Sequence, residues 1–171
     1  DSKITQIYEG TNGIQAMDLL GRKLNLNKGE AFKGLVGKIK EIIETAKTYK
    51  ILNDLSQESQ KTILKLEKTI EHIGGMVKSD KMLTAFSHAY SFLDVTGDVV
   101  MAWMLLWRAT IAVEKLENGT KRKDTDFYTG QIRSAQFFIN SVLPVSRGKM
   151  DVILTSDDAV IQISENSFGG V

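Results

Sequence analysis

Four long segments of the chain repeat apolar residues at the spacing of an α-helix. The clearest runs from Glu30 to Tyr49, where one apolar stripe is flanked by lysines and glutamates. This pattern is typical of an amphipathic helix with one buried face. The chain has 171 residues and a single proline, so helices of this length are permitted. The stripe consists of Phe32, Leu35, Val36, Ile39, Ile42, Ile43, Ala46 and Tyr49.

The same spacing predicts helices over residues 56–77 and 81–118, and a fourth from about residue 124 to Leu143. The stripe of the 81–118 segment is wide, which predicts contact with more than one neighbour. Gly97 within it is interpreted as a point where another helix comes close. Short polar connections between the segments favour an up-down-up-down order. The sequence therefore predicts an all-α protein built on a four-helix bundle.

The two ends of the chain are less regular than the bundle. Pro144 is expected to end or kink the fourth helix, and the tail to residue 163 to form a short strand or a last helical turn. At the other end, residues 12–24 predict a first helix with Asn12 as its N-cap and Gln15 completing a capping box. Residues 25–29 are interpreted as a linker.

Composition excludes several classes of function. The net charge is +1, from 22 basic and 21 acidic residues, so neither nucleic acid nor an anionic membrane surface is an expected partner. The longest apolar stretch, 99–107, is far shorter than the roughly 20 residues of a membrane span. Without cysteine there is no disulfide or thiolate chemistry, which fits a cytoplasmic location. His72 and His88 lie on separate predicted helices and predict no metal site. Trp103 and Trp107, one helical turn apart, are expected in the core.

The segment with most chemical content is Ile7-Tyr8-Glu9-Gly10-Thr11-Asn12-Gly13-Ile14-Gln15. It is a glycine-rich loop that leads into a helix N-terminus. Free amide donors at such an end suit a phosphate or another anion, and the glycines allow a ligand to approach the backbone. Taken alone, this pattern is more typical of an ordinary loop than of a binding site.

The segment resembles a motif of the acyl-CoA dehydrogenase family, near the end of its catalytic region. The family pattern is Tyr-Glu-Gly-Thr, two variable residues, then Ile-Gln, and residues 8–15 match every fixed position. Further on, residues 89–93, 97–100 and 126–132 resemble the extra C-terminal helical domain of the larger members of that family. The resemblance divides the chain into residues 1–25, the end of the catalytic α-domain, and residues 30–171, the C-terminal helical bundle.

The resemblance implies an FAD-dependent oxidation of acyl-CoA to trans-2-enoyl-CoA, with an electron-transfer flavoprotein as partner and a homo-oligomeric assembly. Glu9 would be the base that removes the α-proton of the thioester. Substrate would lie against Tyr8 and Gly10, and the flavin dinucleotide would lie along Thr11, Asn12 and Gly13. His88 and Tyr90 are candidates for facing the catalytic half.

The flavin-holding β-domain of that family is absent from this sequence. The chain is therefore expected to be a structural fragment that neither retains FAD nor turns over acyl-CoA by itself. The alternative interpretation is a free-standing helical interaction module in which the Tyr-Glu-Gly-Thr match is accidental. A four-helix carboxylate metal protein is set aside because Glu-x-x-His pairs are missing.

Overall fold

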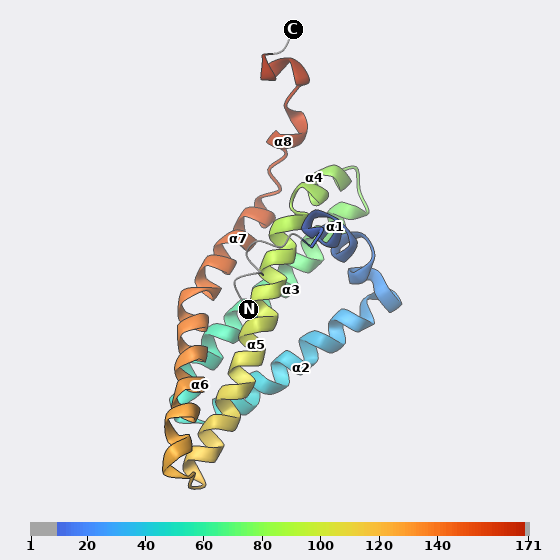
Figure 1. The fold of residues 1–171 in the computed structure, drawn as a ribbon. Helices are drawn as coiled ribbons and strands as arrows, with labels where there is room; N and C mark the ends of the chain where they lie inside the picture. Colours follow the sequence, from blue (N-terminus) through green and yellow to red (C-terminus); the bar gives the residue numbers. More distant parts are fainter. Residues whose placement is uncertain (1–9, 170–171) are drawn as a thin grey trace.

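The computed structural model describes residues 10–169, and within that range the protein is all-α, without a strand (Figure 1). Short 3₁₀ segments join several of the helices: η2 (Lys23–Gly29), η3 (Lys50–Leu52) and, near the C-terminus, η4 (Glu165–Phe168). The helices are α1 (Asn12–Gly21), α2 (Glu30–Lys47), α3 (Asn53–Val77), α4 (Met82–Ser87), α5 (Ala89–Glu117), α6 (Arg122–Ser141), α7 (Leu143–Thr155) and α8 (Ala159–Gln162).

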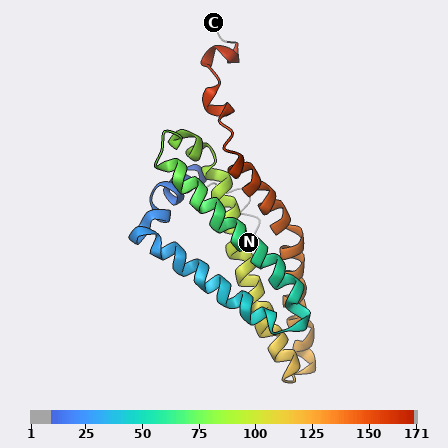
Figure 2. The same ribbon diagram turned by 180° about the vertical axis from the view of Figure 1, so that it is seen from behind.

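The bundle consists of α2, α3, α5 and the bent pair α6–α7, which run up and down in chain order (Figure 1). Helix α5 is central and packs on all the others, most extensively on α6. Helix α3 lies behind α5, as the reverse view shows (Figure 2). The predicted four-helix bundle and the many neighbours of the 81–118 segment are confirmed.

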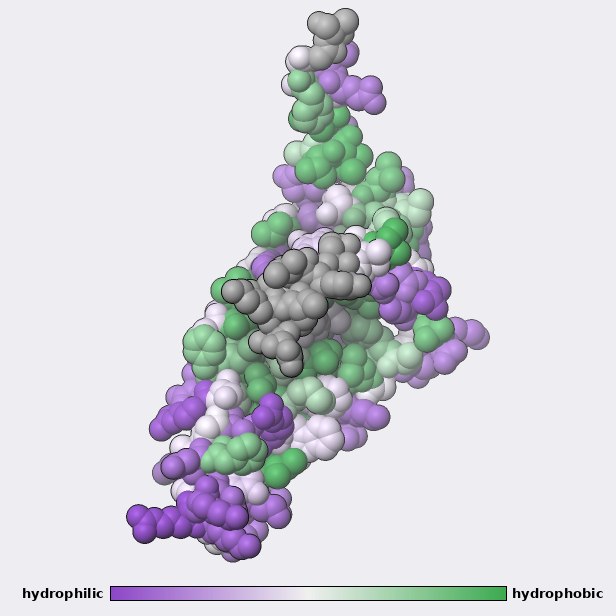
Figure 3. All heavy atoms as spheres, in the orientation of Figure 1, coloured by the Kyte–Doolittle hydropathy of each residue, from purple (hydrophilic) through white to green (hydrophobic). Residues whose placement is uncertain are grey.

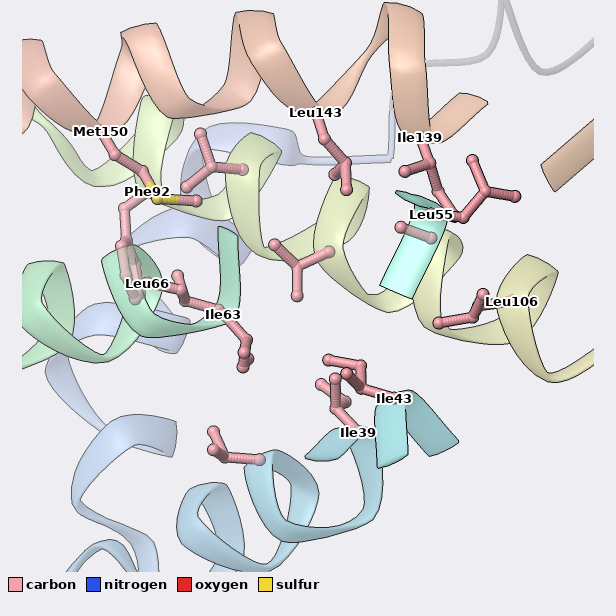
Figure 4. Close-up of a cluster of buried hydrophobic side chains, with 14 of the residues drawn as sticks. Ile39, Ile43, Leu55, Ile63, Leu66, Phe92, Leu106, Ile139, Leu143 and Met150 are labelled. Carbon is pink, nitrogen blue, oxygen red and sulfur yellow. The ribbon is translucent and has the colours of Figure 1, made fainter. Parts of the chain in front are cut away.

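The core is made by the apolar stripes of these helices, which point toward one another (Figure 4). Ile43 from α2, Ile63 from α3, Phe92 from α5, Ile139 from α6 and Met150 from α7 are fully buried. Each side chain of this size contributes about 1.5–3 kcal/mol by leaving water. These stripes explain why the helical spacing in the sequence predicted the fold correctly.

The fourth predicted helix divides just before Pro144 into α6 and α7, and Val142 between them keeps a helical backbone. The helical hydrogen bonds continue across the bend, from Val142 N–H to the Phe138 carbonyl at 2.8 Å and from Ser146 N–H to the Val142 carbonyl at 3.0 Å. Pro144 is the second residue of α7, where a missing N–H breaks no intrahelical bond. The kink is therefore confirmed. Residues 152–154 continue α7, so the strand predicted as one alternative for them is wrong.

The 81–118 segment differs from its prediction in three details. It divides at His88 into α4 and α5. Gly97 is exposed and a Cβ there would meet nothing within 4 Å, so the expected close approach of another helix is wrong. Trp103 is half-buried, but Trp107 stacks on it with ring centroids 6.2 Å apart and is 44% exposed, so its expected place in the core is also wrong.

Polar contacts fix α7 against two helices. On the α3 side, the Arg147 guanidinium donates to Glu58 at 2.8 Å and to the Thr62 hydroxyl at 2.9 Å. On the α5 side, the Ser146 hydroxyl donates to Asp98 at 2.6 Å, and Lys149 pairs with Asp94. These contacts orient the bent fourth helix relative to α3 and α5.

Residues after α7 leave the bundle. Helix α8 and η4 extend beyond its end in both ribbon views, and neither contains a buried residue (Figures 1 and 2). Asp157 accepts a hydrogen bond from the Ala159 N–H at 2.9 Å at the start of α8. None of the helices within residues 10–169 has the length and apolar character that crossing a bilayer requires.

Candidate functional site

Helix α1 holds the described part of the glycine-rich motif against the bundle. Its Ala16 and Leu20 are buried, and α1 packs mainly on α5. At its C-terminal end, a Cβ on Gly21 would lie 3.4 Å from the Phe86 ring of α4, which is ordinary van der Waals contact. The start of α1 is therefore fixed relative to α5 by ordinary apolar packing.

The N-terminus of α1 differs from its predicted cap. Thr11 is the N-cap residue and has a left-handed backbone, with φ 59°. Its carbonyl accepts from the Gln15 N–H at 3.0 Å, and its hydroxyl donates to the Gly10 carbonyl at 2.5 Å instead of capping the helix. Asn12 is the first helical residue, so the predicted capping box from Asn12 to Gln15 is wrong. The left-handed turn at Thr11 already sets the direction of entry, which leaves Asn12 inside the helix.

The geometry at this helix start is compatible with a phosphate ligand. Residues 10–13 are exposed, and a Cβ on Gly13 would meet nothing within 4 Å. The first turn of α1 contains no acidic side chain, and the first amides of a helix point outward with a partial positive charge. The flavin contacts expected for Thr11, Asn12 and Gly13 stay a prediction. So does the contact of Gly10 with substrate, while Tyr8 and Glu9 lie outside the described residues.

A hollow of about 320 Å³ lies beside Asn12, between α1 and α5. Tyr90, Gly97 and two carboxylates, Asp94 and Asp98, line it together with Leu93. Asp94 is paired with Lys149, and Asp98 accepts from Ser146.

Asp18 is the other carboxylate of the α1 segment and is already paired. It accepts from Arg22 Nε at 2.6 Å and from a second guanidinium nitrogen at 2.9 Å. This hydrogen bonding lowers the pKa of Asp18, while the same contact raises the pKa of Arg22. A carboxylate with a lowered pKa is a weak base, so Asp18 is unsuited to removing a carbon-bound proton.

The two histidines make no metal site. The His72 ring Nε2 lies 2.6 Å from the Ser156 hydroxyl, which links α3 to the end of α7. His88 is half-buried at the break between α4 and α5. Across residues 10–169 there is no cluster of three side chains of the types that bind metal ions.

Sequence reasoning did not find the polar contacts that line the hollow. Asp94 and Lys149 are separated by 55 positions, and Asp98 and Ser146 by 48. No local pattern marks such pairs, because the packing of α5 on α7 brings them together. Tyr90 was singled out and does lie beside Asn12, one of the motif residues.

The protein is an all-α bundle in which α1, the helix that carries part of the glycine-rich motif, packs on the central helix α5. Comparison with known proteins gives the family to which such a bundle belongs. The model of the family described as "Acetyl-CoA dehydrogenase C-terminal like" matches residues 35–164. This match covers most of the chain, from within α2 to just beyond α8. The chain belongs to this family.

Curated relatives of the chain are acyl-CoA dehydrogenases. The broad-specificity linear acyl-CoA dehydrogenase FadE5 of Mycobacterium tuberculosis is 28% identical over 98% of the chain. A butyryl-CoA dehydrogenase of Syntrophomonas wolfei is 27% identical over 98% of the chain, and the 3-methylmercaptopropionyl-CoA dehydrogenase of Ruegeria pomeroyi is 27% identical over 96%. The chain spans only 27–28% of the length of these relatives.

Proposed function

We propose that this chain is the C-terminal part of an FAD-dependent acyl-CoA dehydrogenase that oxidises acyl-CoA to trans-2-enoyl-CoA. The observation that carries the proposal is the match of nearly the whole chain to dehydrogenases of several acyl-CoA substrates. The Tyr-Glu-Gly-Thr motif at residues 8–11 adds a catalytic candidate within the matched region. The acyl group is left open, since the relatives differ in theirs.

Glu9 is the proposed base. An α-proton beside a thioester is weakly acidic, so a carboxylate removes it only in a desolvated pocket where the developing enolate is stabilised. When bound, FAD supplies the acceptor for the hydride that leaves the β-carbon. Transfer of the α-proton to Glu9 and of the β-hydride to the acceptor would leave a double bond between C2 and C3 of the product.

The other motif residues are proposed to position substrate and cofactor. Gly10 and Tyr8 would line the thioester and acyl part of the pocket. Thr11, Asn12 and Gly13 would hold the FAD phosphates, which is supported by their place at a helix N-terminus and by the lack of acidic side chains in its first turn. The pocket needs walls from the rest of the full-length protein, so this chain by itself is proposed to be inactive and to lose flavin on desalting.

The division into two parts is also a proposal. Residues 1–25 would end the catalytic region, and residues 30–171 would form the accessory bundle. The family match begins at residue 35, after α1 and η2, which supports this division. A homo-oligomeric assembly, an electron-transfer flavoprotein as acceptor and a cytoplasmic location stay predictions.

The decisive variant is Glu9→Gln in the full-length protein. We expect anaerobic bleaching of the flavin by acyl-CoA to slow at least about 1,000-fold, since a glutamine cannot accept the proton. Asp18→Asn is the matched control, because Asp18 is the paired carboxylate of the same segment, and its bleaching rate should stay within about twofold. Unchanged bleaching in Glu9→Gln would remove Glu9 from catalysis.

The alternative, a free-standing helical interaction module, predicts a different outcome. A full-length protein without a flavin absorbance band, or one that acyl-CoA does not bleach, would favour the module. The family match and the matched relatives support the dehydrogenase instead.

A further inference from the structure

One side of α5 presents uncharged residues at its outer positions, although Leu93 among them also packs against the core. Its outer positions recur at alternating intervals of three and four residues, the spacing of a helix seam that packs on a partner. All are exposed or half-buried, and none is charged. They are Tyr90, Leu93, Gly97, Val100, Met104, Trp107 and Ile111, with exposed Met101 beside them.

A second uncharged stripe follows the outer side of α6 and α7. Its members are all exposed, and the bend at Pro144 does not interrupt it. A Cβ on either of its glycines would meet nothing within 4 Å, so the space above the stripe is open. The stripe comprises Phe127, Gly130, Ser134, Phe137, Ser141, Val145, Gly148 and Val152.

The two stripes lie on the same side of the molecule. Arg108 of α5 bonds to Gln131 of α6, and Asp94 of α5 pairs with Lys149 of α7, so polar links run along the line between the stripes. Figure 3 shows both hydrophobic and hydrophilic residues on this side, with hydrophilic residues gathered at its lower end. We call the exposed large side chains of both stripes the α5–α6 face: Tyr90, Met101, Trp107, Ile111, Phe127 and Phe137.

Part of this side of α5 is already covered by chain from outside the matched family domain. Helix α1 precedes residues 35–164 and packs on α5, and its Asn12 lines one hollow with Tyr90, Leu93 and Gly97. The stripe then continues uncovered along α5, through Met101 and Trp107. Exposed α1 residues Ile14 and Met17 extend the apolar surface on the α1 side. The α1–α5 contact and the α5–α6 face are therefore continuous.

The relatives show how much chain is available to continue this contact. The match covers 28% of the length of the mycobacterial relative, and the matched family describes a C-terminal domain. Under the proposed function, the remaining polypeptide would precede the bundle and would join it through α1, at the edge of the face. Apolar surfaces of this kind mark interaction sites in soluble proteins.

We propose that the α5–α6 face is the surface on which the bundle docks against the preceding catalytic part of its own full-length polypeptide. This inference rests on the proposed function for the identity of the occupant. Docking there would bury Trp107, Phe127 and Phe137 and would hold α1, and with it the start of the glycine-rich motif, between the bundle and the catalytic part.

Oxidative footprinting of the full-length protein tests the inference without any substitution. Met101 lies on the face and is 50% exposed in this structure, while Met82 lies at the start of α4 and is 48% exposed. Methionine oxidation follows the accessibility of the sulfur, so a covered Met101 is oxidised more slowly than its matched control. We expect Met101 to be oxidised at least about fivefold more slowly than Met82, at every protein concentration.

Two outcomes would overturn the inference. Equal oxidation of Met101 and Met82 would mean that the face is open to water. Protection of Met101 that disappears on dilution, together with a fall in molecular mass by light scattering, would mean that a second copy covers it. Flavin bleaching by acyl-CoA, measured on the same preparation, tests the proposed function separately. If the protein is an active dehydrogenase but Met101 is unprotected, only the docking proposal is contradicted.

Discussion

The outer sides of α2 and α3 and the α5–α6 face are built from opposite kinds of residue. The exposed positions of α2 include Lys33, Lys38 and Glu44 and no large apolar side chain, and α3 exposes only Leu64 of that kind. Exposed α5 and α6 positions, in contrast, include large apolar side chains such as Trp107, Phe127 and Phe137 among their charged and polar residues. Lysines and glutamates on a helix surface are typical of contact with water. The bundle therefore has one side suited to water and one side suited to a partner.

The same difference appears within α5 itself. Phe92 and Leu106 face the core, while Tyr90 and Trp107 lie beside them on the exposed side. A helix that is apolar on both sides has more neighbours than the bundle alone provides. Helix α2 has one apolar side only, and the bundle satisfies it.

Truncation on the two sides of α5 should have very different costs. Phe92→Ala removes a fully buried ring and should lower the free energy of unfolding of this chain by about 3–5 kcal/mol. Tyr90→Ala, two residues earlier on the exposed side, should cost less than about 1 kcal/mol. Chemical denaturation monitored by circular dichroism measures both. Similar costs would mean that the exposed side is buried even in this chain.

The polar contacts between α3 and α7 should matter less than the core. Arg147→Ala removes hydrogen bonds to Glu58 and Thr62 and should cost about 1–2 kcal/mol, since the contact is only partly buried. Arg133→Ala is the control, because Arg133 is exposed on α6 and bonds only to Gln136 of its own helix among described residues. An equal cost for the two variants in denaturation would show that α7 does not depend on the α3 contact.

The contacts of Glu58 and Lys149 should weaken at opposite ends of the pH scale. Hydrogen bonding by Lys61, then the charge of Arg147, holds the pKa of Glu58 below 4.5. Its contribution to stability is present above that value and is lost as the pH falls through the lower folded pKa. The bond to Asp94 raises the pKa of Lys149 above 10.5, so its contribution is lost only as the pH rises past that value.

The midpoint of unfolding, measured from pH 2 to pH 12, should therefore change with one variant at acidic pH and with another at alkaline pH. Glu58→Gln should flatten the loss of stability below pH 4.5, and Lys149→Met should flatten the loss above pH 10.5. Each variant should leave the other end of the profile unchanged. A profile that changes at the wrong end would contradict the assigned contacts.

The smallest effect is expected on the solvent side. Lys33→Gln removes an ion pair with Glu30 at 2.9 Å, in which both side chains are exposed. Exposed pairs of this kind contribute roughly 0–0.5 kcal/mol. Chemical denaturation should show no larger change, with or without salt. A cost above about 1 kcal/mol would show that this side of α2 is not simply solvated.

Most of the fold could be predicted from the sequence because each helix shows its buried face in its own spacing. The apolar stripe of residues 30–49 needs no other part of the chain to be recognised. Gly97 and Trp107 were misplaced because spacing shows which residues share a side of a helix, but not whether a neighbour covers that side. The side chains of α5 therefore looked like core on both sides.

The candidate site was less predictable. The residues of the candidate site were identified from their resemblance to a family motif. The N-cap was placed one residue late, because the left-handed backbone of Thr11 has no signature in the sequence. The hollow beside Asn12 depends on Asp94 and Asp98, whose partners lie on α7. Only the packing of α5 on α7 brings these groups together.

The central claim, that one side of the bundle faces water and the other faces the rest of the polypeptide, is tested most directly by one pair of charges. Met101→Asp and Leu64→Asp each place a carboxylate at a site about half exposed in this structure, 50% and 53% respectively. In the full-length protein we predict that Met101→Asp lowers the midpoint of thermal unfolding by at least about 4 °C and that Leu64→Asp changes it by less than about 1 °C. Equal shifts for the two variants would contradict the account.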